Sequence, residues 1–360
     1  MNVINKSGNL NRCSHAISQL VASPDQYVVA PHSIGSLFAL LYLGARGETR
    51  NQLSKFFGLT DDSSILAELK ELDNIFSNDP ATRNFFAFYA RSDFPIEHEF
   101  SQLLRQFSDI QNISFDEEDR ADINVLVEKK TDGLVRNFIS QPFNDDLVFL
   151  LLNTILCKFK FATSFSRFRT KPATFTCLDG SITNVNMMRN TFNDNIIYAE
   201  SDLCQVIELM CDKTNCTFGI ILPRINVPIY QVQNLDPSEL PLNDQWIVEL
   251  YLPKFTIEKQ WDFASLLTKA GLTNPFIHGA DFTEINRSGT MYISMVIQKV
   301  KLEVDERGAT AAAASAIGGR EEGGVYKPNA KEVVMTCNRT FAGYIRIDDK
   351  ILFRFTYDGK

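Results

Sequence analysis

A run of very small side chains interrupts a part of the chain that otherwise has the composition of β-strands. The run lies within residues 304–324, VDERGATAAAASAIGGREEGG. The segments beside it, MYISMVIQKVKLEV and EVVMTCNRTFAGYIRI, are rich in the β-branched and aromatic residues that favour strands. Alanine favours helices and is uncommon in strands. Read with a period of two from Ala309, one side of the run is small and uncharged throughout. Such a segment could enter the middle of an existing sheet, and a short exposed helix or a linker is the alternative.

Composition limits the class of protein and its partners. The chain has 360 residues, and 44% of them are hydrophobic, which is enough for a large core. We expect one α+β domain over residues 1–360, because no internal repeat or low-complexity linker divides the chain. A formal net charge of −8 argues against a nucleic-acid partner, since such binding depends on basic contacts with phosphates. The longest apolar run, LVFLLLNTIL, is too short to cross a bilayer and contains Asn153, so we expect no membrane association.

The motifs present do not indicate a metal site, a cofactor or catalysis. The seven cysteines are odd in number and form no CxxC pair, which predicts free thiols. None of the four histidines lies near Cys204, Cys211 and Cys216 in the sequence, so we expect no metal there. The chain lacks the G-x-S-x-G, phosphate-loop and H-E-x-x-H motifs, and we expect no enzymatic activity and no cofactor. Its first residues, MNVINKSGNLNR, lack the layout of a cleavable secretory signal, which predicts a cytoplasmic protein or one secreted without such a signal.

Two further segments bear on possible polyanion binding. SSILAELKELDNIF has the apolar spacing of a helix, with Ser63 or Ser64 as the expected N-cap, and its charged residues are net acidic. We therefore expect this helix not to bind heparin. The second segment, KFKFATSFSRFRTK, follows the apolar FLLLNTIL and interleaves five basic residues with phenylalanines. We interpret it as a half-buried strand with basic residues on its outer side, and a polyanion groove is the alternative.

Several segments together resemble the serpins, a family of protease inhibitors. EVDERGATAAAAS is similar to the hinge that precedes the family's reactive centre loop, with a glutamate two residues before a glycine and then an alanine run. Other blocks resemble the family in the family's order: VVAPHSIGSLFALLYLGARGETRNQL, INVLVEKKTDGLVRNFI, LLLNTILCKFKFATSF, TFTCLDGSITNVNMMRN and LYLPKFTIEKQWDFASLLTKAGL. The resemblance implies the serpin fold, an α+β fold of about nine helices around three β-sheets, with a large central sheet and an exposed reactive centre loop.

The resemblance also implies which residues have functional roles. It predicts a reactive centre loop over residues 306–330 and a hinge over residues 306–315, with the hinge positions Glu306, Gly308, Ala309, Thr310, Ala311, Ala312, Ala313 and Ala314. It predicts a polar shutter beneath the central sheet at Ser33, Asn153 and Gln298, and Phe161 near the top of that sheet. Gln298 and Phe161 stand where the family usually has histidine and tryptophan, and Ala30 where it usually has serine. A glutamine at position 298 can still form a hydrogen bond with Ser33 or Asn153.

The activity that the resemblance implies is suicide inhibition of a protease. The protease cuts the loop and forms an acyl-enzyme, and the cut loop then enters the central sheet before the acyl-enzyme is hydrolysed. The expected partner is a serine protease, trypsin-like or chymotrypsin-like, with a cysteine protease as the other class, and we expect the inhibitor to be a monomer. The alternative function is that of a non-inhibitory serpin acting as a carrier or chaperone. Its usual mark is a charged or bulky hinge, which this sequence lacks.

The position of the reactive bond depends on whether residues are counted forward from the hinge or back from the strand that follows the loop, and the specificity of the protease adds a third candidate. Family spacing, about sixteen residues after Glu306, gives Glu322–Gly323. A trypsin-like protease would favour Arg320–Glu321, because its specificity pocket forms a charge-assisted contact with arginine. Counting back from NRTF points nearer Tyr326, which suits a chymotrypsin-like enzyme. We expect cleavage between Arg320 and Gly323.

Overall fold

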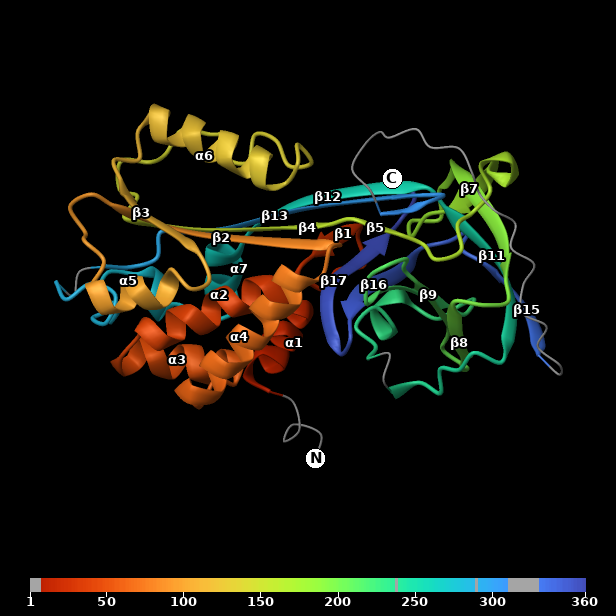
Figure 1. Cartoon of the computed structure of the whole chain (residues 1–360), viewed down its shortest axis with the longest axis horizontal. Helices are drawn as coiled ribbons and strands as arrows, with labels where there is room; N and C mark the ends of the chain where they lie inside the picture. The colour runs from red at the N-terminus through yellow and green to blue at the C-terminus, as the bar shows by residue number, and fades with distance from the viewer. Residues whose placement is uncertain (1–7, 237–238, 289–290, 310–329) are drawn as a thin grey trace.

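The computed structural model describes residues 8–236, 239–288, 291–309 and 330–360, which form helices and three β-sheets (Figure 1). The helices of this described part are α1 Asn9–Val21, α2 Pro31–Gly44, α3 Gly47–Phe57, α4 Asp62–Asn78, α5 His98–Leu104, α6 Glu117–Lys130 and α7 Phe263–Lys269, with 3-10 turns η1 Arg167–Arg169, η2 Ile229–Gln231 and η4 Asn274–Phe276. The strands are β1 Tyr27–Val29, β2 Thr82–Arg91, β3 Asp109–Ile113, β4 Phe149–Cys157, β5 Phe159–Lys160, β6 Lys171–Thr176, β7 Ile182–Phe192, β8 Ile196–Glu200, β9 Cys204–Met210, β10 Cys216–Pro223, β11 Trp246–Pro253, β12 Phe255–Asp262, β13 Met295–Asp305, β14 Gly308–Ala309, β15 Lys331–Thr336, β16 Phe341–Ile347 and β17 Lys350–Tyr357.

The largest sheet runs through the middle of the molecule and has the strand order β3-β2-β4-β13-β14-β5, with β12 paired to β13. Its centre is the parallel pair of β4 and β13, in which residues 150–154 oppose residues 295–299. β2 is antiparallel to β4, and β12 is antiparallel to β13. A six-stranded sheet with the order β1-β17-β16-β10-β9-β8 and a four-stranded sheet with the order β15-β11-β7-β6 complete the fold. The expectation of an α+β fold with three sheets and a large central sheet is confirmed.

The central strands β2 and β4 are buried on both faces along most of their length. One set of alternating side chains packs against Ile123 and Val127 of α6, namely Phe85, Ala87, Tyr89, Leu150 and Leu152. The opposite set belongs to the main core: Phe86, Phe88, Phe149, Leu151 and Ile155. Figure 1 shows α6 on one side of this sheet and α1 to α4 on the other. A sheet covered on both faces needs apolar residues at successive positions, which explains the continuous apolar run FLLLNTIL in β4.

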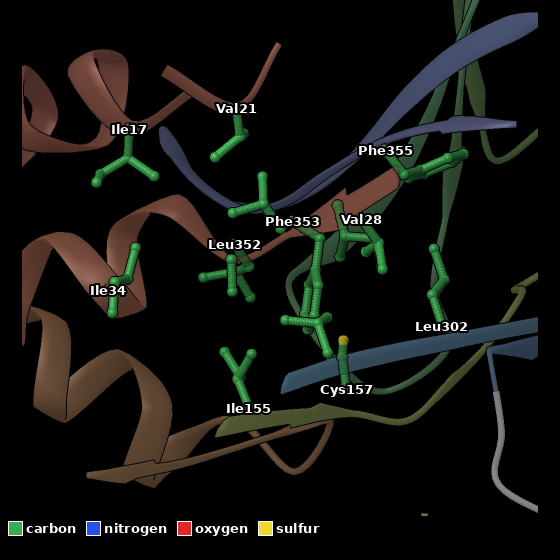
Figure 2. Packing of buried hydrophobic residues seen from close by; sticks show 14 of the residues in the cluster. Ile17, Val21, Val28, Ile34, Ile155, Cys157, Leu302, Leu352, Phe353 and Phe355 are labelled. Atoms are coloured by element: carbon green, nitrogen blue, oxygen red, sulfur yellow. The ribbon is translucent and has the colours of Figure 1, made fainter. Parts of the chain in front are cut away.

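The main core joins the helices to two sheets. Figure 2 shows side chains from α1, α2 and β17 gathered with side chains of the central sheet. The labelled members are Ile17, Val21, Val28, Ile34, Ile155, Cys157, Leu302, Leu352, Phe353 and Phe355. α2 lies inside this core, and every residue of it is buried. Because α2 cannot move without disturbing the core, side chains that it presents to the central sheet are held firmly in place.

The start of α4 differs from the sequence-based expectation, and the end of α6 has a cause in the backbone. The N-cap of α4 is Asp61, whose carboxylate accepts a hydrogen bond from Ser64 N at 2.6 Å, so the prediction of Ser63 or Ser64 was wrong. Asp61 can cap the helix because aspartate accepts bonds from the free N–H groups of the first turn. α6 ends at Lys130, and turns follow it. Asp132 and Gly133 adopt positive φ angles there, which helical backbone does not allow.

The cysteines of the chain are all buried and form no disulfide. Across residues 8–236, 239–288, 291–309 and 330–360, no group of three or more His, Cys, Asp or Glu side chains is arranged to hold a metal ion. None of the helices in those ranges combines the length and the apolar character needed to cross a bilayer.

Candidate functional site

The hinge begins where the central sheet opens between β4 and β13. β13 pairs with β4 only along residues 295–299. Farther along β13, the two-residue strand β14 lies between β13 and β5, so that Ala309 opposes Val304 on one side and Phe159 on the other. β14 is antiparallel to both neighbours, and Ala309 is 1% exposed. Ala309 is therefore already a member of the central sheet.

Gly308 occupies a position where a side chain would not fit. Its φ of +144° lies in the region that favours glycine, and a Cβ atom there would lie 2.3 Å from the carbonyl oxygen of Phe159. Adjacent backbone groups are tied to β5 and to the chain after it. Phe161 N donates to the carbonyl of Arg307 at 2.7 Å, and Phe165 N donates to that of Glu306 at 2.8 Å. The turn from β13 into β14 thus requires glycine at this position.

The carboxylate of Glu306 anchors this turn from inside the protein. Glu306 is 3% exposed, and its Oε1 accepts a hydrogen bond from Thr170 Oγ1 at 2.8 Å. Its Oε2 forms an ion pair with Lys254 Nζ at 2.9 Å. Burial acts to raise the pKa of Glu306, but the bonds from Lys254 and Thr170 outweigh burial and hold this pKa below its ordinary value. Glu306 therefore stays charged and fixed at neutral pH.

The predicted shutter residues meet in one buried hydrogen-bond network. Asn153 and Gln298 oppose one another across the β4–β13 pair, and Gln298 Nε2 donates to Asn153 Oδ1 at 2.5 Å. Asn153 Nδ2 donates to Ser33 Oγ of α2 at 2.6 Å, and Ser33 Oγ donates to Asn84 Oδ1 at 2.6 Å. Gln298 also bonds both backbone groups of Ala30, at 3.0 and 3.1 Å. Ser33, Asn153 and Gln298 are each 0% exposed. This network joins the two strands that an inserted strand would have to separate.

Phe161 lies at the other end of the opening, beyond β5. It is 3% exposed and packs against Phe159, Phe165 and Phe218, with ring centroids 5.9, 5.8 and 5.6 Å apart. Its backbone N–H bonds the hinge at Arg307. The aromatic cluster thus supports β5, which forms one wall of the place occupied by β14.

The remaining predicted loop residues lie outside the described residues: Thr310, Ala311, Ala312, Ala313, Ala314, Arg320, Glu321, Glu322 and Gly323. Sequence reasoning missed three residues of the site, namely Asn84 in the shutter and Thr170 and Lys254 around Glu306. Thr170 and Lys254 lie far from Glu306 in the sequence, and no local pattern marks them. A buried glutamate in the hinge was the one available signal, because a buried carboxylate requires partners.

A serine–histidine pair also occurs inside the described part of the chain, but its surroundings are those of a core contact. Ser14 Oγ lies 3.0 Å from His32 Nδ1, which also lies 2.6 Å from the carbonyl oxygen of Ile351. His32 Nε2 bonds Asn11 Oδ1 at 3.0 Å. Both ring nitrogens are thus engaged, and both side chains are buried. Burial lowers the pKa of His32 to about 4, which makes it a poor general base at neutral pH.

Comparison with known proteins gives one consistent family. The family model described as serpin (serine protease inhibitor) matches residues 11–355. Chicken neuroserpin is 25% identical over 315 residues, which cover 81% of this chain and 76% of the relative. The structure of a thermophilic serpin, tengpin, in the native state superposes with a TM-score of 0.83 at 21% identity, covering 97% of this chain and 92% of the other. Human thyroxine-binding globulin, in a complex with thyroxine, superposes with a TM-score of 0.80 at 19% identity, covering 97% of this chain and 96% of the other.

Proposed function

We propose, from the premise that this chain belongs to the serpin family, that it inhibits a serine protease as a suicide substrate. The protease attacks a bond of the segment between β14 and β15 and becomes covalently attached as an acyl-enzyme. The cut segment then enters the central sheet, displaces the protease and prevents hydrolysis of the acyl bond. The protein itself carries out no catalysis, and its partner supplies the nucleophile.

One observation supports this proposal above the others: the position of β14 at the opening between β4 and β13. β14 is antiparallel to β13 and to β5, which continues β4. A longer strand continuing β14 would therefore run antiparallel to both β13 and β4. It would replace the parallel pairing of residues 150–154 with residues 295–299 by two antiparallel ladders. Antiparallel pairs are somewhat more stable per residue, and each added backbone bond contributes about 1 kcal/mol.

The composition of the hinge suits this place in the sheet. The central sheet is covered on both faces, so each inserted side chain would be buried whichever way it pointed. A charged residue would carry a desolvation cost of several kcal/mol into that space, and a bulky residue would strain the packing. From Ala309 to Ala316 the sequence offers only ATAAAASA, which avoids both costs. We therefore favour an inhibitor over a carrier or chaperone.

The scissile bond is proposed to lie between Arg320 and Gly323. Glu322–Gly323 fits the length that must be inserted, and Arg320–Glu321 fits the specificity of trypsin-like enzymes. Cleavage at Tyr326 would indicate a chymotrypsin-like target instead. A cysteine protease would form the corresponding thioester intermediate, so both nucleophile classes belong in the test.

Incubation with trypsin-like, chymotrypsin-like and cysteine proteases, followed by a denaturing gel, tests this function. An inhibitor forms a covalent complex that survives denaturation, and mass spectrometry of the released C-terminal fragment identifies the bond that was cut. A fragment that begins at Lys327 would show that the loop is cut farther along than we propose. Cleavage by all three enzymes without any covalent complex would instead indicate the carrier or chaperone function.

A further inference from the structure

A short projection stands next to the hinge and shares its anchor. The projection, residues 164–171, lies in the connection after β5, includes η1 and ends at the first residue of β6. Phe165 is buried at the start of the projection and packs edge-to-face on Phe161, with ring centroids 5.8 Å apart. At its other end, Thr170 donates to the buried carboxylate of Glu306 at 2.8 Å. The projection is thus fixed at both ends, and one of its anchors is the glutamate that holds the hinge.

The side chains between these anchors are exposed and have an unusual composition. Phe168 is 97% exposed, and it is flanked by the exposed Arg167 and Arg169, with exposed Lys171 close behind. Among the described residues, none forms an ion pair with these three basic side chains. Two other basic residues near the projection do have such partners: Arg189 of β7 pairs with Glu249, and Lys254, between β11 and β12, pairs with Glu306. The projection thus carries three exposed basic side chains in five residues that no described carboxylate neutralises.

This composition fits a protein interface better than a solvated turn. An exposed phenyl ring gains nothing from water, whereas aromatic and arginine side chains are enriched where protein partners bind most strongly. Three cations with no ion-pair partner among the described residues, on a chain of net charge −8, would attract an acidic surface and repel a basic one. A sulfated polysaccharide could use the cations, but it would gain little from Phe168. The projection also borders the start of the segment that a protease would attack.

We propose that Arg167, Phe168 and Arg169 form a docking surface for an acidic face of the attacking protease. The inference rests on the proposed function in that it takes a protease as the partner. Contact with this surface would speed the association of protease and loop, because complementary charges steer the encounter. Phe168 would then lengthen the lifetime of the encounter by burying its ring against the partner.

Anionic and cationic trypsin are suitable probes, because they share a preference for arginine and lysine but differ in surface charge. The measured quantity is the rate constant for consumption of intact chain, counting both covalent complex and loop-cleaved product. For the wild-type chain we expect the rate constant to be about tenfold higher with anionic than with cationic trypsin. In Arg167→Glu/Arg169→Glu this ratio should fall by about tenfold or more, and in Phe168→Ala both rate constants should fall by about fivefold.

The matched control is Lys55→Glu/Lys269→Glu, which changes the net charge equally at exposed positions on α3 and α7 and should leave the ratio unchanged. An unaltered ratio in Arg167→Glu/Arg169→Glu, or no cleavage within the loop by either trypsin, would overturn the proposal. If Arg167→Glu/Arg169→Glu no longer bound a heparin column but was consumed by both trypsins at the wild-type rates, the surface would be assigned to a polyanion instead. Absence of covalent complex would refute the inhibitory function. The docking surface could still be tested in that case, because the rate constant for consumption also includes loop-cleaved product.

Discussion

Ala309→Arg is expected to turn the protein from an inhibitor into a substrate of the same protease. Ala309 is 1% exposed and belongs to the main apolar cluster, between Val304 and Phe159. A guanidinium at this position would be buried without a counter-ion, since the neighbouring carboxylate of Glu306 is already bound by Lys254. The substitution therefore acts on the step in which the hinge occupies the sheet, and not on recognition of the loop by the protease.

The size of the effect follows from the two states of the hinge. Burying the unpaired charge costs several kcal/mol, whereas the two residues of β14 contribute backbone bonds of about 1 kcal/mol each. In the uncut variant β14 should therefore leave the sheet, with a fall in melting temperature of only about a few degrees. In the cut variant the same cost opposes insertion of the loop. If about 3 kcal/mol of it is present in the transition state for insertion, insertion slows by about 100-fold. Hydrolysis of the acyl-enzyme then precedes insertion.

The assay is the number of inhibitor molecules consumed for each protease molecule inactivated. This number should rise by at least about tenfold in Ala309→Arg, while the rate of loop cleavage stays at the wild-type value. Ala309→Ser is the control, because its side chain is small and uncharged and should preserve inhibition. A normal yield of covalent complex from Ala309→Arg would refute the claim that the hinge must be buried at this position.

Three other predictions test metastability, the shutter and a buried histidine. Cleavage within the loop should raise the melting temperature, because the inserted strand gains bonds and buried contacts, and equal melting of cut and uncut protein would contradict this. Gln298→Leu should lower the free energy of unfolding by about 3 kcal/mol, measured in urea, because it leaves the buried partners of Gln298 at Ala30 and Asn153 without bonds. Burial lowers the pKa of His32 to about 4, below the ordinary 6.5, so between these pH values the unfolded chain binds a proton that the folded chain excludes. Stability should therefore fall as the pH drops from 6.5 to 4, by up to about 3 kcal/mol, and His32→Gln should lose this slope in urea titrations at several pH values.

The fold was predictable from the sequence because its strongest signals are long and continuous. The run FLLLNTIL has the composition of a strand covered on both faces, and β4 has that environment. Helix ends were less predictable where several residues could serve the same purpose. Before α4, the chain offers Asp61, Asp62, Ser63 and Ser64 in succession, and all four are good caps. Asp62 is drawn into an ion pair with Arg50, and Ser64 Oγ bonds Glu68, contacts that depend on the tertiary structure.

The site was predictable only where its residues carry their own pattern. Glycine and the alanine run in the hinge form a pattern that is visible in the sequence, and Gly308 adopts a φ that favours glycine. The partners of Glu306 carry no such pattern, because Thr170 and Lys254 are ordinary polar residues in ordinary strand-rich segments. They bind Glu306 because the tertiary structure brings the end of β11 and the projection after β5 next to the end of β13.

The register of β14 determines where Ser315 would lie in an inserted strand. In an antiparallel ladder each step forward on one strand matches one step back on the other. Ala309 opposes Val304 and Phe159, so a continued strand would bring Ser315, six residues on, opposite Gln298 on β13 and Asn153 on β4. An even number of steps also keeps Ser315 on the same side of the sheet as Ala309, which is the side of the main core. Its hydroxyl would then replace part of the bond between Asn153 and Gln298 that insertion breaks. We predict that Ser315→Val lowers the stability of the cut form by about 1 kcal/mol relative to Ser315→Thr, while the uncut forms melt alike. Equal melting of the two cut variants would show that the inserted strand takes a different register.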